Sequence, residues 1–461
     1  MKTARYPPGP RGLPIIGSVL EYRRDPLAFM GDVARTYGDV ADVRFGPFHS
    51  VLLSHPDDIK DMLVTSNRRF HQGPAHMFLS RALGQGLLTS ENPLHLQQRR
   101  LLQPAFHHQR IAAYAGVMTA YTADMVQEWR AGAELNMAEE MMRLTLRIVG
   151  KALFDTDIRE AASLIGPATH VINDYTSNRS TQVIGPLLDR LPLPDSRRFY
   201  RAKAQLDRFV YQLIAERRSG ERDRGDLLSM LILARDDSGR PMLDRQVRDE
   251  AVTLLLAGHE TTANALTWTW YLLSQHPEVE AKLHAELDTV LAGRLPTLDD
   301  MPALRYTAMV FSETLRLYPP AWGTSKVLVA PWQVRDFALP PGTVVAAISY
   351  LVHRDPRYWS EPERFYPERW TAEATAARPR FAYFPFGGGP RQCIGEPFAW
   401  LEGILILASL ALCWRPRLVP GHPVDTEPLI TLRPKYGMRM VLEQRGQTGD
   451  GIATAQLGSS S

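Results

Sequence analysis

The stretch that most restricts the fold of this chain is Phe-Gly-Gly-Gly-Pro-Arg-Gln-Cys-Ile-Gly at residues 386–395. A cysteine thiolate holds an iron cofactor when a stiff loop keeps water away and points backbone N–H groups at the sulfur. The three glycines would let the backbone come close to Cys393, and Pro390 stiffens the turn. Arg391 can reach an anionic edge of a ligand, and Gly395 lets the next helix begin near it. The alternative is a glycine-rich turn around an ordinary buried cysteine.

A second constraint is an expected helix over residues 244–275, which ends before a proline. At ~1.5 Å per residue it would span about 45 Å, enough to cross the whole domain. Its centre, Ala-Gly-His-Glu-Thr-Thr at residues 257–262, suits a buried helix poorly. Gly258 costs about 1 kcal/mol relative to alanine, and Glu260 is costly to bury unpaired. Helices break these rules where something must approach the backbone, although Thr261 could simply bond to its own preceding turn.

Composition and motif order indicate one large globular domain. Hydrophobic residues make up 44% and charged residues 22% of the 461 residues, which is enough for a large core. Length alone would suggest several domains, but the informative motifs extend from residue 7 to residue 395 with no linker between them. We therefore expect a single domain over residues 1–445, with β-rich parts at about 38–70 and 320–350, and a disordered tail at 446–461.

Charge and cysteine content exclude several classes of protein. The net charge of +3, from 53 basic and 50 acidic residues, gives no reason to expect nucleic-acid binding. Two cysteines, Cys393 and Cys413, cannot form a disulfide framework, so we expect a cytoplasmic protein. The run at residues 398–414 contains Glu402 and predicts a buried helix rather than a membrane span, and we expect no membrane anchor.

Two further pairs of polar residues fall at helical spacing. His95 and Arg99 are four residues apart, so a helix would present them on one face. Taken alone, they would be a solvated basic face. Glu313 and Arg316 have the spacing of an ordinary ion pair, which is worth only ~0.2–0.5 kcal/mol on a helix surface. Neither pair indicates a function by itself.

Together these patterns resemble the cytochrome P-450 family, the haem-thiolate monooxygenases, over roughly residues 7–440. The pattern F-x-x-G-x-R-x-C-x-G matches at residues 386–395, and (A/G)-G-x-(D/E)-T-(T/S) matches at residues 257–262. The resemblance implies a mainly α fold, with a large helical domain and a smaller β-rich region. It also implies haem b, with Cys393 as the axial thiolate ligand of its iron. The positions that match cofactor-binding residues of the family are His95, Arg99, Ala257, Gly258, Lys326, Phe386, Arg391, Cys393 and Gly395.

Two of these positions depart from the residues that the family usually has. Many members have W-x-x-x-R where this chain has His95-Leu96-Gln97-Gln98-Arg99, and Lys326 stands where an arginine is usual. A histidine can still bind a haem carboxylate. A lysine supplies the positive charge without the fork of a guanidinium.

The resemblance implies that the centre of the long helix is the oxygen site. Dioxygen would lie in a groove beside Gly258, with the Thr261 hydroxyl donating to it. Glu260 would relay protons from solvent as a general acid, so that the O–O bond can break. The reaction would be monooxygenation, with two electrons from NAD(P)H. They would pass through a separate ferredoxin or flavodoxin and its reductase, because the chain has no flavin or iron–sulfur segment of its own.

A third family pattern concerns the support of the cysteine loop. Pro-Glu-Arg-Phe at residues 362–365 matches the loop whose arginine completes a Glu-Arg-Arg triad in the family. We therefore expect Glu313, Arg316 and Arg364 to hold the cysteine loop in place as structural residues.

The resemblance also places a substrate pocket, whose apolar lining indicates a lipophilic substrate. A terpenoid-like molecule is the first expectation and a fatty acid is the second. The β-hairpin expected around Gly46-Pro47 would lie at the entrance, where it offers only His49 as a clamp for a carboxylate. A loop at residues 184–192 would cover the entrance. The expected pocket residues are Phe78, Leu88, Ala257, Ala321 and Trp322.

Other functions stay open at this point. A peroxygenase or a non-oxidative haem-thiolate enzyme would use the same fold, although such members tend to lose the acid–threonine pair that Glu260 and Thr261 form here. A haem-binding sensor would have the same cofactor and no turnover. The least specific alternative is a helical protein without a cofactor.

Overall fold

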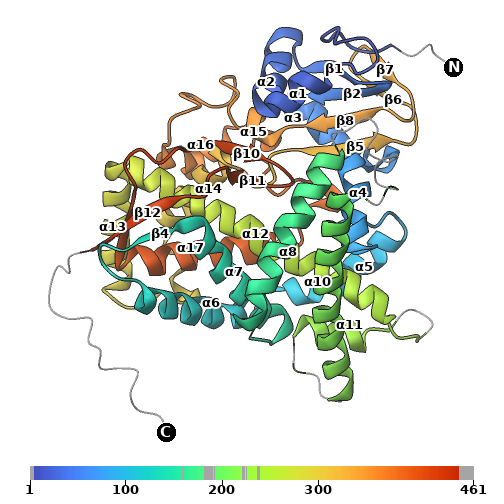
Figure 1. Ribbon diagram of the computed structural model, residues 1–461. Coiled ribbons are helices and arrows are strands. Elements are labelled where there is room, and N and C mark those ends of the chain that lie inside the picture. The colour runs from blue at the N-terminus through green and yellow to red at the C-terminus, as the bar shows by residue number, and fades with distance from the viewer. Residues whose placement is uncertain are drawn as a thin grey trace.

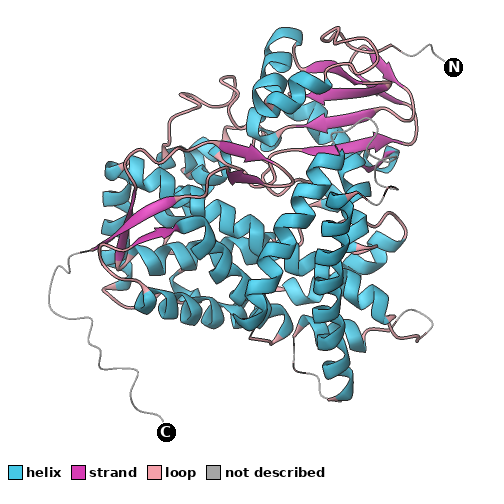
Figure 2. Ribbon diagram, viewed as in Figure 1, coloured by secondary structure: helices cyan, strands magenta, loops and turns pink. Residues whose placement is uncertain are grey.

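The computed structural model describes residues 5–157, 159–180, 191, 193–220, 224, 226–235 and 239–445. Figure 1 shows a helical body with a sheet at the end that carries the N-terminus. The expectation of a mainly helical chain with a smaller β-rich region is confirmed (Figure 2). Of the expected entrance loop at residues 184–192, the structure describes residue 191 alone, and the tail at residues 446–461 lies outside the described residues.

The helices of the body share one large hydrophobic core. Their apolar positions recur at helical spacing, and burial of those faces holds them together. They are α4 (Pro74–Leu83), α5 (Leu94–Leu102), α6 (His108–Glu128), α7 (Met137–Phe154), α8 (Arg159–Ser180), α10 (Pro194–Ser219), α11 (Leu227–Leu233), α12 (Asp244–Gln275), α13 (Pro277–Leu291), α14 (Arg305–Leu317) and α17 (Glu396–Ala411).

Helix α12 crosses the middle of this body, and the prediction of a helix over residues 244–275 is confirmed. Helices α7, α10, α14 and α17 pack against it, so most of its length is buried. Its buried threonines bond to the helix itself, since Thr267 and Thr269 donate to carbonyl oxygens four residues back at 2.7 and 2.8 Å. This internal pairing allows a helix with many polar residues to be covered from all sides.

The larger sheet has the strand order β1-β2-β8-β5-β3. The hairpin predicted around Gly46-Pro47 is confirmed, because β1 and β2 pair antiparallel on either side of that turn. Strand β2 runs parallel to β8, and the pairing of β5 with β3 sets Lys326 opposite Gln72. The strands are β1 (Val40–Phe45), β2 (Phe48–Leu53), β3 (Phe70–Gln72), β5 (Thr324–Leu328) and β8 (Val344–Ala347).

Short elements complete the fold around these two parts. Three smaller sheets are formed by β4, β12 and β9, by β10 and β11, and by β6 and β7. Their bounds are β4 (Glu134–Asn136), β6 (Trp332–Val334), β7 (Phe337–Leu339), β9 (Trp414–Leu418), β10 (Thr426–Pro428), β11 (Leu432–Pro434) and β12 (Arg439–Gln444). The short helices are α1 (Val19–Arg24), α2 (Pro26–Tyr37), α3 (Pro56–Lys60), α15 (Ser349–Val352) and α16 (Ala372–Ala376).

Helix α17 begins directly after the cysteine loop and packs against α6, α12 and α14. Every residue from Leu401 to Ala411 is buried, so the prediction of a buried helix within residues 398–414 is confirmed. An apolar run of this kind is what a helix covered on all sides requires. None of the helices in the described part of the chain is long and apolar enough to cross a membrane.

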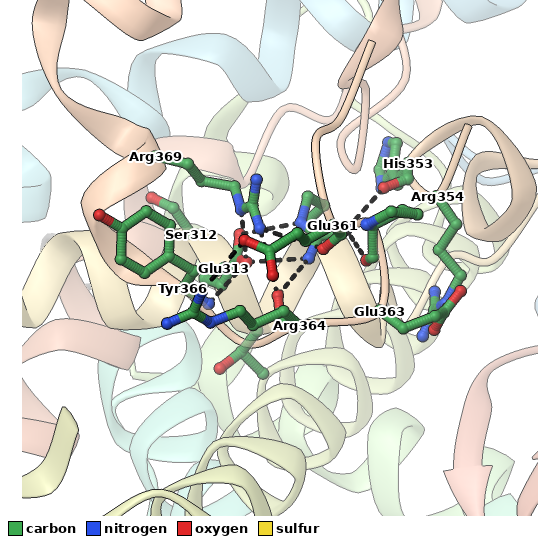
Figure 3. Close-up of polar contacts among 12 residues, drawn as sticks. Ser312, Glu313, His353, Arg354, Glu361, Glu363, Arg364, Tyr366 and Arg369 are labelled. Atoms are coloured by element: carbon green, nitrogen blue, oxygen red, sulfur yellow. Dashed lines mark hydrogen bonds and ion pairs between the residues drawn. The ribbon is translucent and has the colours of Figure 1, made fainter. Parts of the chain in front are cut away.

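A buried carboxylate on α14 organises the segment that leads to the cysteine loop. Glu313 and Arg316 have no exposed side-chain surface and form two hydrogen bonds of 2.8 and 2.9 Å. The backbone N–H of Tyr366 donates to Glu313 at 3.0 Å. Figure 3 shows Glu313 in a group of polar residues that includes Arg369 and Tyr366.

The prediction that the side chain of Arg364 completes this cluster is wrong. The Nε of Arg369 donates to Glu313 at 2.8 Å, and this guanidinium is buried (Figure 3). Arg364 instead pairs with Glu361, and both side chains are more than half exposed. The turn η5 (Pro367–Trp370) packs against α14, which directs residues 369 and 370 inward, while Arg364 contributes only its carbonyl oxygen.

The cluster reaches the cysteine loop through one histidine. Arg316 donates to the carbonyl oxygen of His353 at 2.9 Å. On the other side, Nε2 of His353 accepts from the backbone N–H of Phe384 at 3.0 Å, two residues before the loop begins at Phe386. Burial and the charge of Arg316 hold the pKa of His353 well below its usual range, which keeps this nitrogen an acceptor.

We expect Arg369→Ala to destabilise the protein strongly, because it leaves the buried Glu313 with one arginine fewer. A loss of about 3–5 kcal/mol in the free energy of unfolding is typical for a broken buried pair. Arg364→Ala is the matched control, since it removes an exposed pair and keeps the carbonyl oxygen that the cluster uses. Its effect should stay within about 0.5 kcal/mol. Urea denaturation of both variants measures the difference, and equal destabilisation would contradict the assignment.

Candidate functional site

The Cys393 side chain keeps accessible surface although protein surrounds it. The side chain has accessible surface, yet the surrounding protein raises the pKa of the thiol to about 11 by burial. These two facts agree if the sulfur faces an interior space rather than the outer surface. The backbone N–H groups of Gly395 and Glu396 bond to the sulfur and counteract part of that rise. N–H donors of this kind stabilise a thiolate.

The glycines of the loop serve its packing, which differs from the expected reason for them. Gly389 has a φ of +68°, and a Cβ there would lie 2.1 Å from the carbonyl oxygen of Leu63. A Cβ on Gly388 would lie 2.6 Å from the ring of Phe381. These glycines therefore let the loop rest on the turn η1 (Asp61–Thr65) and on Phe381, rather than making room at the sulfur.

The centre of α12 is accessible on one strip only. Ala257 is exposed, and Gly258 and Thr261 are half-buried, whereas the residues from Ala251 to Leu256 are buried. The Thr261 hydroxyl donates to the carbonyl oxygen of Ala257 at 2.9 Å, so the bond to its own preceding turn is present. A Cβ on Gly258 would lie 3.2 Å from Val149 of α7, so this glycine lets the two helices come close.

Glu260 lies behind this strip and is held by two neutral side chains. Only 6% of the residue is exposed. One carboxylate oxygen accepts from the hydroxyl of Thr431 at 2.5 Å, and the other accepts from the amide of Asn173 on α8 at 2.5 Å. Asn264 donates to the Thr431 hydroxyl at 3.2 Å. Sequence reasoning missed Asn173 and Thr431, since tertiary folding alone brings them to Glu260.

A basic cluster lies where α4, α5, β5 and the cysteine loop meet. Its members are His76, His95, Lys326 and Arg391. Burial and the positive charges of neighbours lower the pKa of both histidines to about 4, and burial and Arg391 lower that of Lys326 to about 8. The Nδ1 atoms of His76 and His95 are buried without a hydrogen-bond partner. Both histidines are therefore neutral at neutral pH, and the carboxylate of Glu91 is the acidic group that acts on Lys326 and Arg391.

Hydrogen bonds inside the protein engage part of this cluster. Arg391 donates to the carbonyl oxygen of Ser90 at 2.7 Å and to the carboxylate of Glu91 at 2.6 Å. Lys326 donates to Gln72 at 2.9 Å. Sequence reasoning identified Arg391, Lys326 and His95 but missed His76, which no motif marks.

Arg99 adjoins the basic cluster, since its charge acts on His95 and Arg391, but it bonds to the cysteine loop. Its guanidinium donates to the carbonyl oxygen of Gln392 at 2.8 Å, next to Cys393 in the chain. Burial lowers the pKa of Arg99, and the negative charge of a Cys393 thiolate counteracts part of that shift, so the two groups are close enough to interact. Arg99 therefore supports the cysteine loop from α5.

The expected pocket residues differ in how much of their surface is exposed. Ala257 and Ala321 are exposed, and Leu88 is 36% exposed, whereas Phe78 is only 2% exposed and offers little surface to a ligand. Trp322 is half-buried, donates to the carbonyl oxygen of Leu429 at 2.8 Å and packs against the cluster between α2 and the larger sheet.

The donor set fits a cofactor with a soft metal ion and anionic edges. A thiol that faces an interior space with backbone N–H groups on its sulfur suits a soft metal ion. Unpartnered imidazole nitrogens and buried positive charges suit carboxylates. Haem has both features, so the residues present fit that group.

Comparison with known proteins agrees with this fit. The family model described as Cytochrome P450 matches residues 7–438. The chain is 40% identical to the Cyclooctatin synthase of Streptomyces melanosporofaciens over 96% of each chain. It is 38% identical to the Cyclooctat-9-en-7-ol 5-monooxygenase of the same organism, over 89% of this chain and 90% of the relative.

A third relative is the Pentalenene oxygenase of Streptomyces avermitilis, which is 33% identical over 95% of this chain and 97% of that protein. Coverage from end to end at these identities leaves no large part of the chain outside the family. The chain belongs to the cytochrome P450 family, the haem-thiolate monooxygenases.

Proposed function

We propose that the protein hydroxylates a lipophilic, terpenoid-like small molecule, using dioxygen and two electrons from NAD(P)H. The electrons come from a separate ferredoxin or flavodoxin and its reductase. The observation that carries the proposal is the accessible strip at Ala257 and Thr261 in the buried central part of α12, with the carboxylate of Glu260 behind it. Two of the relatives are named for the oxygenation of cyclooctat-9-en-7-ol and of pentalenene, which supports a cyclic, lipophilic substrate of this class.

The cofactor of this proposal is haem b, with Cys393 as its thiolate ligand. When bound, the haem supplies the activation of dioxygen, and its thiolate ligand favours cleavage of the O–O bond. His76, His95, Lys326 and Arg391 would bind its carboxylates. Arg99 and the N–H groups on the sulfur hold the cysteine loop in place.

Thr261 and Glu260 supply the protons. The Thr261 hydroxyl can leave the carbonyl oxygen of Ala257 and donate toward dioxygen in the space beside the strip. Glu260 serves as the general acid, held in position by Thr431 and Asn173. One oxygen atom enters a C–H bond of the substrate, and the other leaves as water with two protons and two electrons.

A fatty acid is the weaker candidate for the substrate. The one side chain of the hairpin turn that could clamp a carboxylate is His49. Its Nδ1 bonds to Asp42 at 2.7 Å, and its ring stacks on Tyr6 with centroids 3.7 Å apart. His49 is therefore engaged. The intact Glu260 and Thr261 pair argues against a peroxygenase or a non-oxidative enzyme.

Turnover under ¹⁸O₂ tests the proposed function. Purified protein, a surrogate ferredoxin with its reductase, and NADPH are incubated with cyclic terpenoids or with fatty acids. We expect a terpenoid product with one ¹⁸O atom, detected by mass spectrometry. A product from fatty acids alone would overturn the substrate class. If the haem-loaded protein converts neither class of compound, and neither class changes its haem absorption spectrum, a sensor would be favoured.

We expect Thr261→Ala to uncouple NADPH use from product formation, because the proton donor beside the oxygen site is lost. Product per NADPH should fall about tenfold, with a matching rise in hydrogen peroxide. Thr261→Ser keeps the hydroxyl and is the control. Unchanged coupling in the alanine variant would remove Thr261 from the mechanism.

We expect Thr431→Val to lower the rate of product formation about tenfold, since Glu260 loses a charge-assisted hydrogen bond. Thr431→Ser restores the donor and should restore the rate. The substrate KM should change little, and the kinetic solvent isotope effect should increase as proton delivery becomes limiting. A change in KM alone would indicate that Thr431 acts on the substrate instead.

Haem retention should depend on Lys326 in a pH-dependent manner. A bound carboxylate would raise the pKa of Lys326 from about 8, so binding takes up a proton above that pH. Lys326→Met should therefore lose haem faster than wild type below about pH 8, and the advantage of wild type should shrink as the pH rises. Transfer of haem to excess apomyoglobin measures both rates of haem loss. Because the Cys393 thiol releases a proton in both proteins, the difference between their rates reports the effect of Lys326 alone. Lys60→Met, on the exposed surface, is the control.

A further inference from the structure

Two consecutive carboxylates of α12 bind the stretch of chain at residues 84–90, which lies between α4 and α5. Asp249 accepts from the backbone N–H of Gln85 at 2.9 Å. Glu250 accepts from the backbone N–H of Leu87 at 2.9 Å. Because neighbouring residues of a helix point about 100° apart, the stretch curves around α12 to reach both carboxylates. We call residues 84–90 the anchored segment.

The anchored segment lies directly on α12 because two of its residues are glycines. Gly84 has a φ of +67°, and a Cβ there would lie 2.1 Å from Oδ2 of Asp249. A Cβ on Gly86 would lie 2.2 Å from the hydroxyl oxygen of Thr253. A side chain at either position would push the segment away from the helix. The close contact is therefore built into the backbone.

Glu250 is fully buried, and only one of its two oxygen atoms is bonded. Within the described part of the chain, Oε1 has no hydrogen-bond partner. Burial raises the pKa of Glu250 to about 8, while the N–H of Leu87 counteracts part of that rise and the charge of Asp249 adds to it. A buried oxygen atom without a partner costs much less on a neutral carboxyl group than on a carboxylate. The seated segment therefore favours the neutral form of Glu250.

Asp249 is the charged group that acts on Glu250. Arg248, the residue before it, is bonded to Asp249 and to Asp207 of α10. The anchored segment itself contains no titratable side chain. Titratable groups of the helices packed against this end of α12 have partners of their own, as Lys203 has Asp207 on α10, Arg217 of α10 has Asp226 before α11, Lys151 has Asp155 at the end of α7, and Arg81 of α4 lies over the ring of Phe78. His76 of α4 belongs to the basic cluster.

The other end of the anchored segment is bonded to the basic cluster. The carbonyl oxygen of Ser90 accepts from Arg391, and the hydroxyl of Ser90 donates to Gln98 of α5 at 2.5 Å. Gln98 in turn donates to the carbonyl oxygen of Gln85 at 2.6 Å. Leu88, which is 36% exposed, lies between these contacts in the chain. Its position therefore depends on how the segment is seated on α12.

The seat of this segment and the accessible strip lie on one face of α12. Glu250 and Ala257 are seven residues apart, which is close to two helical turns, so about 10 Å along the axis separates them. Movement of the anchored segment would thus change the space next to the strip.

We propose that Glu250 is a positioning residue whose protonated carboxyl group seats the anchored segment on α12, and that loss of this proton loosens the segment and the wall of the substrate pocket at Leu88. The role in the pocket rests on the proposed function, whereas the seating of the segment does not. When the segment opens, water reaches Glu250 and its pKa returns to about 4.5. Between about pH 4.5 and pH 8, each rise of one pH unit therefore favours opening by up to tenfold. Above about pH 8 the effect levels off, because the seated form loses its proton as well.

Hydrogen exchange of the haem-loaded, full-length protein between pH 6 and pH 9 tests the seating. Mass spectrometry of peptides that cover residues 84–90, corrected for the intrinsic exchange rate at each pH, gives the opening constant of the segment. In wild type this constant should rise about fiftyfold between pH 6 and pH 8 and only about twofold more up to pH 9. In Glu250→Gln it should not change with pH, since the amide oxygen still accepts from Leu87 and does not titrate. Glu216→Gln, on the exposed surface of α10, is the control and should behave as wild type.

Optical titration with a cyclic terpenoid tests the role in the pocket. The dissociation constant of wild type should increase from pH 6 to pH 8, and that of Glu250→Gln should increase much less. The KM of the two proteins should differ in the same way while kcat stays similar, because the segment holds the pocket and not the proton donors. The haem absorption spectrum checks that each variant is folded.

Three outcomes would overturn the proposal. An opening constant of wild type that does not change with pH is the first, and it requires no variant. Equal pH dependence in Glu250→Gln and wild type is the second, because the proton would then belong to another group. The third is opening that depends on Glu250 without any effect on the affinity for the terpenoid, since the segment would then not position the pocket. If the turnover experiment fails, the exchange measurement still decides whether Glu250 seats the segment.

Discussion

The buried carboxylate of Glu313 is the interaction on which the geometry of the cysteine loop depends. A carboxylate with no exposed surface is strongly unfavourable unless donors surround it. Arg316, Arg369 and the indole of Trp370 supply those donors, and the same arginines bind carbonyl oxygens of the segment between β8 and the loop. The cost of burying the charge is offset only when all of these groups are in place. The cluster therefore fixes the path of the chain toward Phe384, and with it the position from which Cys393 is presented.

The second constraint is the burial of α12. The polar residues at its centre fall into two groups, according to whether they face other helices or the accessible strip. Those that face other helices are satisfied by the helix itself or by specific partners, as Thr267 and Glu260 are. Thr261, on the accessible strip, instead keeps its hydroxyl at that strip, where it bonds to the carbonyl oxygen of Ala257. Because Glu260 draws its donors from α8 and from the turn between β10 and β11, the position of this acid depends on three elements. The proposed proton delivery is thus tied to the packing of the parts that surround the strip.

Sequence reasoning succeeded where the signal is local and failed where the answer depends on packing. The helix at residues 244–275, the hairpin at Gly46-Pro47 and the buried α17 follow from periodicity, a proline and an apolar run. Spacing could not decide between Arg364 and Arg369, because the turn η5 determines which of them faces Glu313. His76, Asn173 and Thr431 carry no motif. The strand register sets Gln72 opposite Lys326, and His76 follows Gln72 by only four residues. This pairing therefore places His76 among the basic residues.

The basic cluster shows why a binding site can be locally unfavourable in its own protein. Burial makes the charged forms of His76, His95 and Lys326 costly, and the positive charge of Arg391 adds to that cost for each of them. Glu91 compensates Arg391 alone through a direct ion pair. A ligand with two carboxylates would supply the missing negative charge and partners for the unpaired imidazole nitrogens at once. Binding energy of this origin adds to the stability of the folded state, so the cluster couples cofactor binding to the order of α4, α5 and the cysteine loop.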